Sequence, residues 1–109
     1  MKPVAIAEVV VVDDETRPRA LGYICVDLVK TFHDLDLRMR ARASRLGHGY
    51  IGLTRSSSLI VPGALFDHVA AHRVALLIFP DLTHMRGRIP PELVEITALH
   101  DLATGITYQ

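Results

Sequence analysis

The sequence predicts a single α+β domain over residues 1–109, with an antiparallel or mixed β-sheet of about five to six strands and two helices. Two observations lead to this class. Segments rich in valine and isoleucine come first along the chain, and helical patterns are joined to strand patterns only later. In addition, no repeat, low-complexity tract or linker divides the 109 residues, a length that suits one domain.

The first half of the chain is expected to form strands. Residues 4–12 and 20–29 are apolar and lie on either side of the turn sequence DDETRP, so they predict a β-hairpin. After the glycine turn LGHG, residues 50–54 and 59–62 predict two further strands, which the serines at 56–58 connect.

The segment HDLDLRMRARASR, residues 33–45, contains four arginines, although the net charge of the chain is zero. Over residues 34–42 apolar and charged residues alternate, which favours a strand with its charged residues on one face. A helix is the alternative, because Phe32, Leu35 and Met39 also fall near helical spacing, but Leu37 is then out of phase.

The second half of the chain mixes helices and strands. Residues 63–73 predict a short helix, and residues 74–80 predict a buried strand, although a buried helical segment has the same composition. A loop over 80–91 leads to a final helix in ELVEITALHDLAT, residues 92–104. Pro91 suits the start of that helix and Gly105 suits its end.

Composition restricts the possible functions. Basic and acidic residues number 12 each, so any nucleic acid must be bound by a local patch of positive charge. Half of the residues are hydrophobic, which is high for a small monomer and suggests a homo-oligomer, a dimer or larger. The one cysteine, Cys25, lies among apolar residues and suits a reducing environment. Because we find neither a signal peptide nor a long apolar run, we expect a cytoplasmic protein with no membrane partner.

One family resemblance covers residues 4–72. The stretch ICVD, with Ile24, Val26 and Asp27, is followed at the same interval by His33, Asp34 and Leu35 in FHDL, and then by a glycine turn, YIGL and LIVP. This order is similar to that of the stage V sporulation protein G family of small bacterial regulators. The resemblance implies a dimeric DNA- or RNA-binding regulator. The hairpin after YIGL is shorter here than in the family, and residues 74–109 have no counterpart.

The arginines are the leading candidates for a binding site. On a strand, alternate arginines project from one face about 7 Å apart, close to the phosphate spacing of a nucleic acid. The candidate nucleic-acid-binding residues are Arg38, Arg40, Arg42, Arg45 and Arg55. The alternative is a solvated face whose arginines pair with Asp34 and Asp36.

The histidines support a different hypothesis. His68 and His72 are four residues apart on one helix face, a spacing that two zinc ligands can use, with His84 and His100 as candidates for the third ligand. Because two ligands seldom suffice, we expect no metal or other cofactor. A small enzyme or ligand-binding protein, with a pocket between subunits, would be lined by His68, His72, His84 and Arg86. An interaction subunit is a third possibility. No nucleotide-binding or hydrolase motif occurs, so a catalytic residue is not predicted and an enzyme is not favoured.

Overall fold

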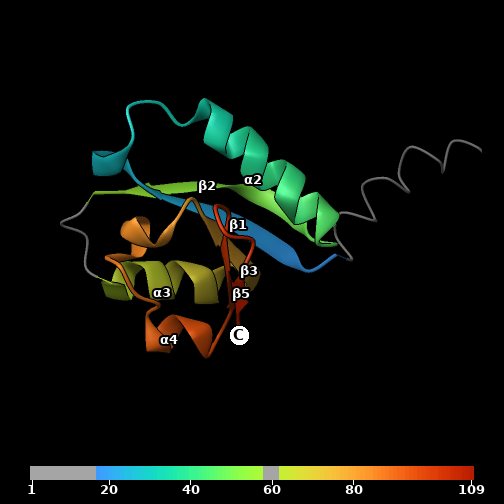
Figure 1. Ribbon diagram of the computed structural model, residues 1–109. Helices are drawn as coiled ribbons and strands as arrows, with labels where there is room; N and C mark the ends of the chain where they lie inside the picture. The colour runs from blue at the N-terminus through green and yellow to red at the C-terminus, as the bar shows by residue number, and fades with distance from the viewer. Residues whose placement is uncertain (1–16, 58–61) are drawn as a thin grey trace, which may run out of the picture.

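In the computed structural model, which describes residues 17–57 and 62–109, a β-sheet lies between two layers of helices (Figure 1). The described residues form five strands, three α-helices and two short 3-10 helices. The strands are β1 (Arg19–Cys25), β2 (Gly49–Ser56), β3 (Val74–Phe79), β4 (Ala98–Asp101) and β5 (Thr107–Tyr108). The helices are η1 (Val26–Leu28), α2 (His33–Arg45), α3 (Pro62–Ala71), η2 (Leu82–Met85) and α4 (Pro91–Val94).

The sheet is mixed, and its strand order is β2-β1-β3-β4-β5. Strands β2, β1, β3 and β4 are parallel to one another, and β5 pairs with β4 in the antiparallel direction. The predicted α+β class with a mixed sheet of about five strands is confirmed, as are two helices of ten residues or more, α2 and α3. Between β1 and β2 the chain passes through α2, where the sequence predicted a strand, and between β2 and β3 it passes through α3, which corresponds to the helix predicted at 63–73.

The core has two parts, one on each face of the sheet. Even-numbered residues of β1 and β3, such as Ile24 and Ile78, pack with Met39 of α2. Odd-numbered residues, such as Leu77 and Phe79, pack with Val69 of α3. All but one residue of β3 are buried, which explains its uninterrupted apolar sequence VALLIF, since a central parallel strand has both faces covered.

Helix α2 packs unusually closely on β1 at Gly22. A Cβ atom built at this position would lie 2.5 Å from the hydroxyl of Tyr50, 2.7 Å from the sulfur of Met39 and 3.1 Å from Leu53. Distances this short are not tolerated between non-bonded atoms, so a side chain at residue 22 would require Tyr50 and Met39 to move. The absence of a side chain at residue 22 therefore allows Met39, which is fully buried, to approach the sheet.

The predicted strand at 34–42 is wrong, because these residues belong to α2. The alternative helical spacing is the correct one: Met39 and Ala43 are buried, while Leu37, which only the strand interpretation placed inside, is 49% exposed. The charges also suit a helix. Asp34 and Asp36 lie in the first turn and Arg42 in the last turn, where they oppose the helix dipole favourably.

The predicted final helix over residues 92–104 is also wrong in most of its length. Helix α4 ends at Val94, and residues 98–101 form β4, which pairs with β3. The predicted helix at 63–73 and the strands at 20–29, 50–54 and 74–80 match α3, β1, β2 and β3 with small shifts of their ends. The strands predicted at 4–12 and 59–62 fall wholly or mostly outside the described residues.

We predict that Gly22→Ala lowers the free energy of unfolding by about 1–3 kcal/mol, the usual cost of forcing extra volume into a packed core. The new methyl group would collide with the Tyr50 hydroxyl and with Met39. Urea denaturation of the two proteins measures the difference.

A double-mutant cycle tests the stated cause. Because the Tyr50 hydroxyl is the closest atom to the new methyl group, Gly22→Ala should cost less in a Tyr50→Phe background than in the natural protein. An equal cost in both backgrounds would show that the close approach of helix and sheet does not explain the effect.

Candidate nucleic-acid interface

Helix α2 divides the arginines of residues 33–45 between two sides of the molecule. The guanidinium of Arg40 lies 5.0 Å from the centre of the Tyr50 ring, on the side of β2. Arg42 instead contacts His100 of β4, and Arg38 and Arg45, four residues before and three residues after it, share its face of the helix. Since β2 and β4 lie on opposite sides of β1 and β3, the five predicted arginines do not form one row.

Arg42 has a structural contact that involves a buried histidine. Its Nη1 atom lies 2.8 Å from Nε2 of His100, whose other ring nitrogen lies 2.7 Å from the hydroxyl of Thr107. A guanidinium can only donate, so Nε2 accepts and Nδ1 carries the proton that it donates to Thr107. Burial and the neighbouring Arg42 lower the pKa of His100, while Asp101 opposes them. His100 is therefore neutral, and joins α2 to β4 and β5.

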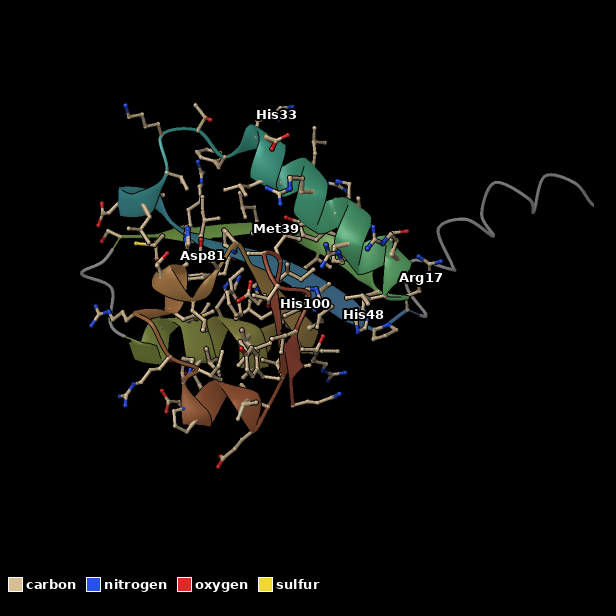
Figure 2. All side chains as sticks on the ribbon, viewed as in Figure 1. Arg17, His33, Met39, His48, Asp81 and His100 are labelled. Atoms are coloured by element: carbon tan, nitrogen blue, oxygen red, sulfur yellow. The ribbon has the colours of Figure 1, made fainter. Side chains whose placement is uncertain are left out.

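A second group of arginines gathers beside β2, the edge strand of the described sheet. Four exposed arginines take part: Arg17, before β1; Arg19, at its start; Arg40, on α2; and Arg55, near the end of β2. We call these four, with His48, the β2-edge basic surface. Figure 2 shows Arg17 and His48 close to the C-terminal end of α2, far from Asp81.

Three adjoining hollows follow this surface. One, of about 420 Å³, is lined by Arg17, Arg19, Arg40 and His48, and no carboxylate lines it among the described residues. Arg40 also lines a hollow of about 280 Å³ with Arg55, His33 and Asp36. Arg19 also lines a third, of about 410 Å³, with His68 and His72. The first hollow shares Arg40 with the second and Arg19 with the third, so all three border the same edge strand.

A β-bulge in β2 lies where the hollows meet. Ala20 pairs with Tyr50 and Gly22 with Leu53, so two residues of β2, Ile51 and Gly52, stand opposite one residue of β1. Gly52 has a φ of +136°, which a residue with a side chain rarely adopts, and Ile51 is 46% exposed. The bulge bends the edge strand and presents an apolar side chain between the arginines.

The aromatic rings that the arginine segment itself lacks come from other elements. The guanidinium of Arg55 lies 4.7 Å from the centre of the Phe32 ring. This arrangement is similar to that of Arg40, whose guanidinium lies over the Tyr50 ring. Tyr50 in turn donates a hydrogen bond of 2.7 Å to Asp36, and burial together with this bond raises its pKa well above the usual range. The phenol stays protonated, and its ring is fixed beneath Arg40.

The histidines predicted to line one pocket fall into two groups. His68 and His72 have ring centres 4.4 Å apart on α3 and face the third hollow, where Thr54 contacts His68. His84 and Arg86 lie instead at the C-terminal ends of β1 and β3, in other hollows. Among the described residues, no group of three histidine, cysteine or acidic side chains is placed to hold a metal ion.

Charge is distributed unevenly along the chain. Every basic residue except Lys2 lies in the described part, whereas four of the 12 acidic residues, Glu8, Asp13, Asp14 and Glu15, lie within residues 1–16. The described part is therefore net positive although the whole chain is neutral. Also within that part, no helix combines the length and apolar composition needed to cross a membrane.

Comparison with known proteins gives no relative: no protein family, curated protein or solved structure matches this chain. The resemblance to the sporulation regulators therefore stays a hypothesis that depends on the quoted residues alone. Sequence reasoning did not select Arg17, Arg19 or His48, because their neighbourhood depends on the pairing of β1 with β2. The sequence signal for that pairing was an apolar run on either side of a helical segment, which is typical of a parallel β-α-β unit.

We predict that the protein loses stability as the pH falls below about 6.5, the ordinary pKa of histidine. Burial lowers the pKa of His100 and also of His84 in the folded state, so the unfolded chain binds protons first. The loss of stability begins as the pH falls below the histidine pKa of the unfolded chain, and it is complete once the pH is below the lower pKa values of the two histidines in the folded protein. Urea denaturation between pH 5 and 8 measures it.

The variant His100→Gln separates the two histidines. A glutamine amide oxygen can replace Nε2 as the acceptor for Arg42, but it does not titrate. We expect the pH dependence to shrink in this variant and to keep only the part due to His84. A full pH dependence in His100→Gln would contradict the role of the Arg42–His100 contact.

Proposed function

We propose that this protein is a small nucleic-acid-binding regulatory protein that uses the β2-edge basic surface. The observation that carries the proposal is the gathering of four exposed arginines, from elements far apart in the sequence, along one hollowed strand edge. Arginine donates two parallel hydrogen bonds to phosphate oxygens and stays charged, so a track of this kind suits a polyanion.

The rings beneath two of the arginines favour an extended strand with unpaired bases. A guanidinium held over an aromatic ring is already oriented, so it loses less conformational freedom when it binds phosphate. Tyr50 and Phe32 provide such rings, and the exposed Ile51 adds an apolar contact for a base. Proteins that bind single strands without sequence preference combine a basic groove with stacking groups in this way.

The proposal also includes a cytoplasmic location and a homo-oligomeric state. Nucleic acid is found in the cytoplasm of a bacterial cell, and the buried free thiol of Cys25 suits a reducing compartment of that kind. Among residues 17–57 and 62–109, seven large hydrophobic residues are more than a third exposed, and three of them, Ile51, Ile96 and Ile106, are isoleucines. This exposure supports a homo-oligomer.

We predict that binding to a 20-nucleotide single strand weakens steeply with salt. If four arginines neutralise phosphates, the slope of log affinity against log salt concentration should be about −3, at roughly 0.7 per contact on a single strand. Arg40→Ala should reduce the magnitude of the slope by about 0.7, the contribution of one contact, and lower the affinity. Fluorescence anisotropy between 20 and 200 mM salt measures both.

Arg38→Ala is the matched control. It removes the same charge from an exposed position on the same helix, but on the other side, so the slope and affinity should change little. Equal effects of Arg38→Ala and Arg40→Ala would point to bulk charge instead of this surface. The proposal fails if the natural protein binds no oligonucleotide at 20 mM salt.

We also predict an oligomer, a dimer or larger, at micromolar concentration, because of the exposed hydrophobic residues. Sedimentation equilibrium gives the mass directly, compared with 12.1 kDa for one chain. A mass of one chain over the whole concentration range would rule the oligomer out.

A further inference from the structure

The hollow of about 420 Å³, here called the first hollow, differs from the other two on the β2-edge basic surface in its charge. It is lined by Arg17, Arg19 and Arg40 together with His48, and no carboxylate borders it among residues 17–57 and 62–109. The second hollow, of about 280 Å³, has Asp36 on its wall. The third, of about 410 Å³, is lined by one arginine. Positive charge is therefore concentrated in the first hollow.

The first hollow lies at one end of the basic surface. Arg19 is the first residue of β1 and Gly49 is the first residue of β2, and these two residues pair with each other. Arg17 and His48 come just before the two strands, and Figure 2 shows both close to the C-terminal end of α2. Arg55 lies near the opposite end of β2. Within the described part of the chain, the basic track along β2 thus ends in the first hollow.

Two of the three guanidiniums in the first hollow are oriented before any ligand binds. Nη1 of Arg19 donates a hydrogen bond of 2.9 Å to the backbone carbonyl of His72. A guanidinium has five N–H donors, and a carbonyl does not neutralise it, so Arg19 keeps its charge and further donors for a ligand. The guanidinium of Arg40 lies 5.0 Å from the centre of the Tyr50 ring. Both arginines therefore lose less conformational freedom on binding an anion.

The C-terminal end of α2 also borders this hollow, and its hydrogen-bond acceptors are occupied. The carbonyl oxygens of residues 42–44 accept hydrogen bonds from the backbone N–H groups of residues 46–48. The carbonyl of Leu46 lies 2.8 Å from Nδ1 of His48, which donates because a carbonyl only accepts. Unpaired carbonyls give a helix C-terminus its partial negative charge, so these bonds reduce its repulsion of an anion.

We propose that the first hollow binds a terminal phosphate monoester, so that the protein recognises a phosphorylated end of a single strand. A monoester has a charge of about −1.5 to −2 near pH 7 and three free acceptor oxygens, whereas a phosphodiester inside the strand has one charge and fewer free oxygens. Three guanidiniums without a carboxylate match the monoester. The inference rests on the proposed function, because the adjoining nucleotides would follow β2 toward the second hollow.

The test compares 20-nucleotide single strands of one sequence that differ only at their ends. They carry a 5′-phosphate, a 3′-phosphate or hydroxyl groups at both ends, and a fluorophore at an internal position. Fluorescence anisotropy at 50 mM salt gives the Kd of each strand. We expect one phosphorylated strand to bind about tenfold more tightly than the hydroxyl strand, which corresponds to one further hydrogen bond to a charged group. Only one end should give this gain, because a strand has a direction and the basic track fixes it.

A methyl ester on the favoured terminal phosphate provides a chemical control. The ester keeps most of the bulk of the phosphate but leaves it with one negative charge. We expect this strand to lose most of the gain in affinity. If the methyl ester binds as tightly as the free phosphate, the hollow does not select a monoester and the inference is wrong.

Two arginine variants locate the phosphate. Of the three hollows, Arg17 lines only the first and Arg55 lines only the second, and both side chains are exposed. Arg17→Ala should lower the ratio of the hydroxyl-strand Kd to the phosphate-strand Kd from about ten to below about three, because it removes a charged donor to the phosphate. Arg55→Ala is the matched control. It should weaken the binding of both strands by a similar factor and leave the ratio unchanged.

The outcomes distinguish this inference from the proposed function. Equal affinities for all three strands would overturn the strand-end site and leave the proposed single-strand binding intact. An equal gain from both phosphorylated ends would show an effect of added charge alone and would also overturn it, as would an equal loss of the ratio in Arg17→Ala and Arg55→Ala. A nucleoside monophosphate that competes as tightly as the phosphorylated strand binds would identify a site for free nucleotides instead of a strand end. If no strand binds even at 20 mM salt, the proposed function fails as well.

Discussion

The close contact between α2 and the sheet at Gly22 determines where the charged residues of the protein lie. Because residue 22 has no side chain, Met39 reaches the backbone of β1, and the Tyr50 hydroxyl occupies the remaining space and donates to Asp36. These contacts fix the rotation of α2 about its own axis. Once that rotation is fixed, Arg40 must lie beside β2 and Arg42 must lie beside β4.

The rotation of α2 also gives the arginines different chemical tasks. On one side Arg42 donates to the buried His100, which holds β5 through Thr107, so this arginine is part of the architecture. On the other side Arg40 lies over an aromatic ring, is exposed to solvent and borders two hollows. Arginines that form a row in the sequence therefore lie on two sides of the helix in the folded protein. The position of each arginine relative to the sheet distinguishes a structural arginine from one that is available for binding.

The sequence predicted the parts of the fold that depend on local pattern. The apolar runs of β1, β2 and β3 and the helix α3 were found because burial on one or two faces leaves a direct mark on composition. Residues 34–42 were misassigned because nine consecutive residues alternate between charged and apolar, which satisfies the period of a strand, while the helical spacing depended on fewer residues. Leu37 decided the choice, and it is half exposed. Residues 98–101 look helical locally, but pairing with β3, a contact distant in sequence, makes them a strand.

The candidate sites were harder to predict because each needs the strand order. Arg17 and Arg19 meet Arg40 only because β1 pairs with β2 in parallel, and His84 meets Cys25 only because β1 pairs with β3. Apolar runs that end in CVD and FPD are nevertheless a usable signal, since polar residues directly after parallel strands collect at one edge of a sheet. The β2-edge basic surface follows an outer strand of the described sheet, where a long polyanion has room.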